Sequence, residues 1–330
     1  VALLLPTKVA PLEPVGLDEI AAHSSLSKEQ LEDILEGLCQ RGVLFCDRTR
    51  DGKKRYALHQ VGYGFPQAFF WKGEEAPHAR KMADLIGKYF NRRVTREAYA
   101  GAATKAYRYV PVGTSLPHDL QAVYPYHMME AVVRQARVFA VAHCPCRLVM
   151  RLRGKGCEHP LEVCLKFDEM AQYLIDRGLG REITGEEALE IIKKSEEAGL
   201  VHFVDNAANG VKHNCNCCGC ACWNVGNIRR RKIPRDELMA TYFLRDTDED
   251  RCTGCGECAA VCPVEALTIK DGLPVIDEEW CIGCGVCVTR CPSAAARLKP
   301  RPDKIDQGPL ADFKELHERI LLEKGLSRRG

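Results

Sequence analysis

Apolar residues recur at three- and four-residue intervals after residue 27, which is the spacing of one buried helix face. Ser27 and Gln30 stand three residues apart just before this pattern and form a capping-box start, and Gly42 marks its end. The apolar positions are Leu31, Ile34, Leu35 and Leu38. The pattern predicts a helix over residues 27–42, preceded by a short helix at residues 16–23.

Residues 43–59 change to two strand-like runs around an Asp51-Gly52 turn. Helices followed by such a hairpin predict a winged helix over residues 1–62. This fold would bind DNA or serve as a docking module. Charge favours docking, because phosphate binding needs a basic helix, and here acidic residues outnumber basic ones. The helix carries Glu29, Glu32, Asp33 and Glu36 against Lys28 and Arg41. The basic wing, which keeps DNA open as an alternative, carries Arg48, Arg50, Lys53, Lys54 and Arg55.

The central part of the chain mixes helical and strand patterns. Helices are predicted at residues 77–91, 126–138 and 184–198, the last of which starts at a Thr184-x-x-Glu187 capping box. On the first of these helices the predicted apolar face consists of Met82, Leu85, Ile86 and Tyr89. Short strands are predicted at residues 107–112 and 200–204. The fold class is therefore α+β, with a mixed helical middle domain over residues 63–245.

Composition adds one unusual feature. The chain has 330 residues, enough for two or three domains, with 46% hydrophobic residues, 28% charged residues and a net charge of +2. This balance is ordinary for a globular protein and does not by itself favour a strongly charged partner. No stretch has the length of a membrane span or the features of a secretory signal, so we expect a cytoplasmic protein. The unusual number is 19 cysteines.

Eight of these cysteines fall into two copies of Cys-x2-Cys-x2-Cys-x3-Cys-Pro. Thiolates in this spacing are ligands of iron–sulfur clusters, whereas zinc motifs usually pair two Cys-x2-Cys halves across a longer gap. Glycines in each copy allow the loop to turn so that amide N–H groups point at sulfur, and Pro263 and Pro292 end the loops. The first copy contains Cys252, Cys255, Cys258 and Cys262, and the second contains Cys281, Cys284, Cys287 and Cys291.

Residues 246–300 resemble the bacterial-type ferredoxin with two [4Fe-4S] clusters. In such ferredoxins the fourth cysteine of each run binds the other cluster. The resemblance therefore places Cys291 with Cys252, Cys255 and Cys258 on one cluster. It places Cys262 with Cys281, Cys284 and Cys287 on the other. The tail, residues 301–330, is expected to form an amphipathic helix at residues 310–324 that covers the ferredoxin module or a partner.

Nine further cysteines lie in the middle region. The first loop holds Cys144, Cys146, Cys157 and Cys164, and the second holds Cys215, Cys217, Cys218, Cys220 and Cys222. Thiols this dense in polar loops would oxidise one another unless they were bound. We expect the loops to fold together around two more [4Fe-4S] clusters, with the adjacent Cys217 and Cys218 pointing different ways. One cluster with redox-active thiols is the second interpretation, and zinc is the third. Cys39 and Cys46 are predicted to be buried thiols rather than ligands.

Several polar residues flank these loops. His143, His159 and His213 are candidate neighbours of clusters, rather than direct ligands, because a histidine beside a thiolate can donate a hydrogen bond to sulfur. Arg147 is expected to offset cluster charge. The basic run from Arg229 to Lys232 is either a solvated face or a docking patch for an acidic redox partner.

The order of modules is similar to a family of 4Fe-4S-binding proteins of anaerobes that pair a winged helix and Cys-rich loops with a double ferredoxin. That resemblance implies an iron–sulfur redox role. The leading hypothesis is an electron-transfer protein, or a subunit of an oxidoreductase complex, whose partner is a larger metalloenzyme or another ferredoxin. Motifs for nucleotides, radical chemistry or haem attachment are missing, which disfavours a self-contained enzyme. The alternatives are an enzyme with a reactive middle-domain cluster and a redox-sensing winged-helix regulator.

Overall fold

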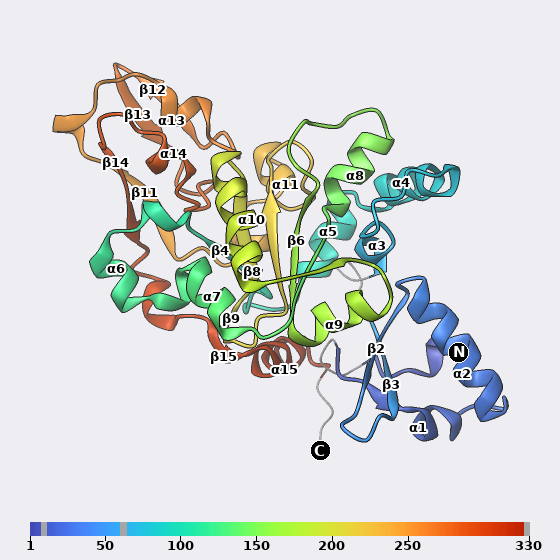
Figure 1. Cartoon of the computed structure of the whole chain (residues 1–330). Coiled ribbons are helices and arrows are strands. Elements are labelled where there is room, and N and C mark those ends of the chain that lie inside the picture. The colour runs from blue at the N-terminus through green and yellow to red at the C-terminus, as the bar shows by residue number, and fades with distance from the viewer. Residues whose placement is uncertain (8–11, 60–64, 327–330) are drawn as a thin grey trace.

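The computed structural model describes residues 1–7, 12–59 and 65–326. Helices and strands are mixed throughout, as the α+β prediction requires. Figure 1 shows the N-terminal module (blue) and the cysteine-motif region near the C-terminus (orange to red) at opposite ends of the molecule, with a sheet between them. Within the described ranges, no helix is long and apolar enough to cross a membrane.

The N-terminal module contains two helices and a small antiparallel sheet with the order β1-β3-β2. The capping box at Ser27 forms as predicted, with the reciprocal Ser27 and Gln30 bonds, and Gly42 takes a left-handed φ of 69° just past the helix. The elements are β1 (Val15–Gly16), α1 (Leu17–Ala21), α2 (Lys28–Gln40), β2 (Leu44–Arg48) and β3 (Lys54–Leu58). The assignment to the winged-helix fold stays a prediction.

Several basic residues of the hairpin between β2 and β3 form ion pairs within this module. Lys54 lies 2.9 Å from Glu32 on α2, Arg55 pairs with Asp47, and Lys53 lies 3.2 Å from Asp51. These ion pairs reduce the positive charge available to bind DNA phosphates. DNA binding stays an untested alternative.

A six-stranded antiparallel sheet with the order β4-β8-β10-β6-β5-β7 dominates the middle region, where we had expected mostly helices. Its strands are β4 (Tyr107–Val110), β5 (Phe139–His143), β6 (Glu162–Phe167), β7 (Arg181–Ile183), β8 (Val201–Asp205) and β10 (His213–Cys217). The sequence did not predict this sheet, because β5 and β6 are short apolar runs. The spacing of apolar residues does not distinguish such runs from a buried helix.

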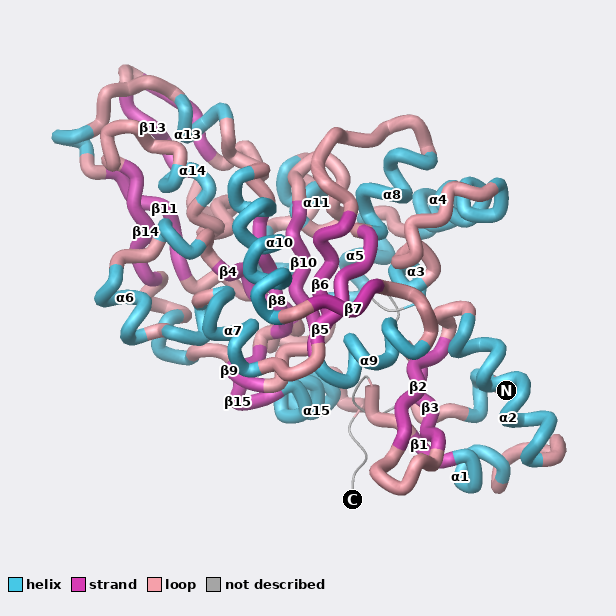
Figure 2. Tube along the Cα trace, viewed as in Figure 1, coloured by secondary structure: helices cyan, strands magenta, loops and turns pink. Residues whose placement is uncertain are grey.

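Helices cover this sheet on both sides (Figure 2). α7 and α10 pack on one face through residues such as Met129, Val133 and Ile192. The helices of this region are α3 (Phe65–Ala68), α4 (Pro77–Tyr89), α5 (Arg92–Tyr99), α6 (His118–Val123), α7 (Met129–Gln135), α8 (Pro145–Leu152), α9 (Asp168–Asp176), α10 (Gly185–Glu197), α11 (Val225–Arg229) and α12 (Arg235–Leu238). The other face carries the thiols described below.

Two helix predictions need correction. On α4 the buried face is Ala79, Ala83 and Ile86, while Leu85 and Tyr89 are about half exposed, because α4 packs on α8 through its small residues. The helix predicted at residues 126–138 is only α7, since a 3-10 turn at Pro125–His127 precedes it.

The C-terminal region contains two hairpin-like pairs and a tail. Its elements are β11 (Phe243–Thr247), α13 (Glu257–Ala260), β12 (Leu267–Lys270), β13 (Leu273–Ile276), α14 (Val286–Thr289), β14 (Ala296–Pro300), β15 (Leu310–Asp312) and α15 (Phe313–Glu323). β15 replaces the predicted start of the tail helix and pairs in parallel with β9 (Ala207–Asn209). The tail therefore lies on the middle region. The prediction had placed it on the ferredoxin-like segment or on a partner.

The N-terminal module is fixed to the middle region through α9. The single proton of the buried Tyr173 hydroxyl is shared between the carbonyls of Cys39, at 3.1 Å, and Leu44, at 2.9 Å. Arg177 pairs with Glu36 at 2.8 Å and donates to the Cys46 sulfur. Cys39 and Cys46 are buried, as predicted.

We expect Tyr173→Phe to lower the free energy of unfolding by about 1–3 kcal/mol, because two buried carbonyls lose their donor. Chemical denaturation of the purified protein measures the change. Tyr89→Phe is the matched control, since this tyrosine is half exposed and its substitution is expected to change stability by less than about 0.5 kcal/mol. Equal stability of both variants would contradict this role of Tyr173.

Candidate metal centres

The Cys-rich face of the sheet follows from strand periodicity. Side chains two apart on a strand share a face, so Cys215 and Cys217 of β10 point the same way, and Cys164 of β6 stands directly opposite Cys215. Cys144 lies at the N-cap of α8, with Cys146 in its first turn. The Asn-Cys-Asn-Cys sequence of β10 is thus a strand pattern, with thiols on one face and buried amides on the other.

Six thiols surround one narrow pocket on this face, which we call the six-thiol pocket. It is lined by Cys144, Cys146, Cys164, Cys215, Cys217 and Cys222, together with Phe203 and Trp223. The two loops do fold together, as the sequence predicted. Six soft donors around one enclosed space fit a sulfur-ligated metal centre.

Hydrogen bonds among these thiols favour the ionised form of some of them. Hydrogen bonds from Cys164 and Cys217 lower the pKa of the Cys215 thiol well below its usual range, against the opposing effect of burial. Hydrogen bonds from Cys146 and Cys217 likewise lower the pKa of Cys222. Because the thiolate is the metal ligand, this arrangement is suited to binding.

The other three middle-region cysteines gather at a second place, the three-thiol site. It consists of Cys157, Cys218 and Cys220, with His159 beside them. Cys217, the last residue of β10, and Cys218, which follows the strand, thus face different sites, as expected for this adjacent pair.

The three flanking histidines have different surroundings. His213 lies 3.2 Å from Asp205; burial lowers the pKa of His213, but the carboxylate outweighs burial and raises it to about 9. This places a cation next to Cys215. His143 instead contacts the carbonyl of Trp71 at 3.2 Å, so the structure does not bring it to the thiols.

Arg147 lies between the two thiol groups. Its side chain is fully buried and donates hydrogen bonds to the carbonyls of Pro160 and Asn216, one from each Cys-rich loop. Burial lowers its pKa, but the neighbouring thiols, Cys144 first among them, more than offset this and raise the pKa. The predicted role in offsetting charge therefore gains a structural component, because the guanidinium joins the loops.

The ferredoxin-like segment forms two equivalent loops. α13 and α14 begin after the left-handed glycines Gly256 and Gly285. Gly283, which also has a positive φ of 61°, packs closely against the backbone of β11. A Cβ atom there would lie 2.1 Å from the Phe243 carbonyl oxygen, so only glycine fits. At Gly254 it would lie 2.5 Å from the Gly272 oxygen.

The fourth cysteine of each loop receives a backbone hydrogen bond. Ala266 donates its N–H to the Cys262 sulfur at 3.3 Å, and Ala296 donates to Cys291 at 3.4 Å. Amide-to-sulfur bonds are thus found after the Cys-Pro dipeptides, and backbone hydrogen bonds also reach Cys258 and Cys284 beside the glycines, as expected. Burial raises the pKa of Cys262, and Cys281 from the other loop raises it further. The crossing of ligands stays a prediction.

Arg245 of β11 lies at the centre of this segment. It is buried, and its Nε and Nη1 atoms have no hydrogen-bond partner among the described residues. Burial raises the pKa of Cys258 and of Cys287, and Arg245 opposes the rise at both. A buried guanidinium with two unpartnered nitrogens, set between thiols of both loops, fits a segment that holds anionic metal–thiolate groups.

Residues 251–295 match the family model of the 4Fe-4S dicluster domain. The chain is also 42% identical over 40 residues to one subunit of an ion-translocating oxidoreductase complex from Methanosarcina acetivorans. That alignment covers 12% of this chain and 15% of the relative, so it concerns only a small part of both. No solved structure matches the chain. These similarities support 4Fe-4S binding and iron–sulfur electron transfer by the segment, which we now call the dicluster module.

The dicluster module packs directly on the Cys-rich face. Gly219, between Cys218 and Cys220, approaches Pro263 so closely that a Cβ atom at 219 would lie 1.8 Å from the Pro263 oxygen. One continuous apolar cluster contains Cys217 and Cys222 from the middle region and Cys281 and Cys284 from the module. The two cysteine-rich regions are therefore neighbours in space.

Tyr109 of β4 lies inside this junction. Its hydroxyl is buried and has no hydrogen-bond partner among the described residues. Burial raises its pKa, as do Cys222 and Cys217 on one side and Cys284 on the other. The sequence carried no signal for Tyr109 or for Arg245, because neither residue belongs to a motif.

The basic run after the second loop is only partly available for docking a partner. Arg229 pairs with Glu265 of the dicluster module, and Arg231 donates to the carbonyls of Val264 and Glu265. Half of the run therefore joins the two regions of this chain, which leaves Arg230 and Lys232 exposed.

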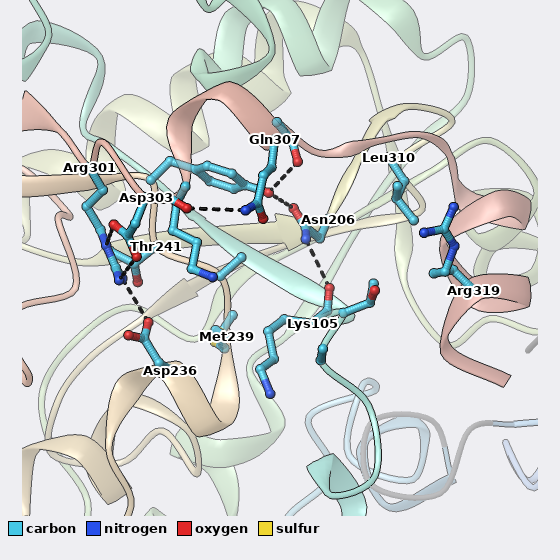
Figure 3. Close-up of a pocket in the computed structure, with 16 residues that line it drawn as sticks. Lys105, Asn206, Asp236, Met239, Thr241, Arg301, Asp303, Gln307, Leu310 and Arg319 are labelled. Carbon is cyan, nitrogen blue, oxygen red and sulfur yellow. Dashed lines mark hydrogen bonds and ion pairs between the residues drawn. The ribbon is translucent and has the colours of Figure 1, made fainter. Parts of the chain in front are cut away.

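A separate cavity of about 760 Å³ lies between the tail and the middle region. Figure 3 shows Arg301 bridging Asp236 and Asp303, while Lys105 and Arg319 stand elsewhere around the cavity. Met239 belongs both to its wall and to the apolar cluster of the junction. The cavity is thus separated from the thiols by side chains, and its surplus of cations distinguishes it chemically from the metal centres.

Proposed function

We propose that this chain transfers electrons between the dicluster module, a further iron–sulfur centre in the six-thiol pocket, and a partner oxidoreductase or ferredoxin. The observation that carries the proposal is the close packing of Gly219 on Pro263, next to the Cys262 ligand position. The apolar cluster that spans both regions supports it. We further propose a cytoplasmic, low-oxygen setting, in which exposed centres of this kind survive.

A [4Fe-4S] cluster, when bound, supplies one-electron transfer. The chain contributes position, burial and charge. Cys252, Cys255, Cys258 and Cys291 would hold one cluster of the module, and Cys262, Cys281, Cys284 and Cys287 the other. Arg245 would balance negative charge at both, and Tyr109 excludes water from the space between the module and the six-thiol pocket.

Metal analysis tests the number of centres. Anaerobically purified full-length protein is expected to contain about twelve irons with equal labile sulfide, at four per cubane. About eight irons would show that the six-thiol pocket holds no cluster, and the proposed transfer would then be wrong.

Gly219→Ala tests the route. The added methyl group must displace the Pro263 backbone, and overpacking of this kind is expected to cost about 1–3 kcal/mol of stability. We expect slower electron transfer from the module to the middle-region centre, measured by freeze-quench EPR after rapid reduction. Gly37→Ala is the matched control, because a Cβ atom at Gly37 meets nothing within 4 Å. Unchanged transfer in Gly219→Ala would contradict the route.

A further inference from the structure

The three-thiol site has a geometry of its own. The sulfurs of Cys157 and Cys218 are 3.8 Å apart. The ligand atoms of Cys157, His159 and Cys220 all lie within 4.8 Å of one another. Cys220 is also within hydrogen-bond reach of Cys218. Ligand atoms of Cys157, His159 and Cys220 therefore form one compact group, and the Cys218 sulfur lies beside the two sulfurs of that group.

These distances distinguish a single ion from a cluster. Tetrahedral zinc with Zn–S bonds of about 2.3 Å places its sulfurs about 3.8 Å apart. In a cubane each thiolate binds a different iron, which spreads the thiolates around a larger body. The 3.8 Å between the Cys157 and Cys218 sulfurs fits one ion. The six-thiol pocket differs, because its thiols follow one another around a cavity rather than meeting at a point.

Arginine side chains of α8 hold the loop that carries Cys157 and His159. Arg151 donates to the Cys157 carbonyl at 3.0 Å and to the His159 carbonyl at 2.8 Å. Arg147 binds the carbonyl of Pro160 in the same loop. These bonds fix the backbone around both donors and leave the thiol and imidazole free to bind an ion.

We infer that Cys157, His159, Cys218 and Cys220 form a structural zinc site, distinct from the iron–sulfur centres. Four protein ligands of the Cys3His type leave no open position, which is the composition of structural rather than catalytic zinc. The ion would join the loop between α8 and β6 to the loop after β10. By holding Cys218 it would also fix the direction in which Cys217 faces the six-thiol pocket.

Metal content of the full-length protein tests the inference. The wild-type protein, expressed with both iron and zinc supplied, is expected to hold about one zinc per chain. X-ray absorption at the zinc edge should give three sulfurs at about 2.3 Å and one nitrogen at about 2.0–2.1 Å. Wild-type protein without zinc, or zinc with four sulfurs, would overturn the assignment.

Variants separate this site from the other centres. His159→Ala is expected to lose zinc on dialysis against a chelator and to keep its iron, whereas His159→Cys keeps zinc with four sulfurs. Cys222→Ser is the matched control, because it removes a thiol from the six-thiol pocket and should leave zinc in place. Loss of iron instead of zinc in His159→Ala would contradict the proposal. Zinc and iron are counted separately, so failure here is distinguishable from failure of the electron-transfer proposal.

Discussion

Replacing Cys262 and Cys281 together by alanine is expected to remove about four irons per chain, at four per cubane. The two residues come from different motifs, yet the structure places their thiols close enough for one to raise the pKa of the other. If they bind the same cluster, the second cluster of the dicluster module remains intact. Iron analysis and EPR of the reduced protein measure the outcome.

The matched control also removes two thiols, but from different predicted clusters. Cys258→Ala with Cys281→Ala takes one ligand from each predicted cluster, and we expect a loss of about eight irons. Equal losses in the two double variants would contradict the crossing of ligands. Cys39→Ala, which changes a buried thiol of the N-terminal module, should leave the iron content unchanged.

Arg147→Met is expected to lower the free energy of unfolding by about 3–5 kcal/mol, since it removes a buried charge and leaves two buried carbonyls without a donor. The two Cys-rich loops would lose their shared contact. We therefore also expect loss of metal from the middle region while the dicluster module keeps about eight irons. Chemical denaturation and metal analysis measure both effects.

Arg134→Met is the control for Arg147. Arg134 forms a surface pair with Glu130 and its side chain is 75% exposed, so the expected change is only about 0–1 kcal/mol. Arg147→Lys keeps the charge but cannot reach both carbonyls as a fork, so an intermediate loss is expected. A variant Arg147→Met as stable as Arg134→Met would show that the guanidinium does not hold the loops together.

Features that depend on residues close together in the sequence were predicted best. The capping residues Ser27 and Thr184 hold their predicted helices, because an N-cap bond depends only on neighbouring residues. The dicluster motifs are equally local, since their spacing encodes the ligand set. The divergence of the adjacent Cys217 and Cys218 was also expected from the sequence, and the structure places them at different sites.

Long-range features were less predictable. The six-stranded sheet brings Cys164 opposite Cys215 across about 50 residues of chain, and no local pattern specifies that register. The tail is another case: residues 310–312 read as the start of a helix but pair with β9, since tertiary contacts outweigh a weak local preference. The sorting of nine cysteines into six and three likewise required the fold.

Arg245 couples the two halves of the dicluster module through one charge. Its guanidinium faces thiols of both loops, so each half depends on the same cation for its electrostatic balance. A substitution that removes this charge is expected to lower both reduction potentials, because a nearby positive charge favours the reduced form at each centre. A change at Arg245 therefore cannot alter the reduction potential of one cluster of the module without altering that of the other.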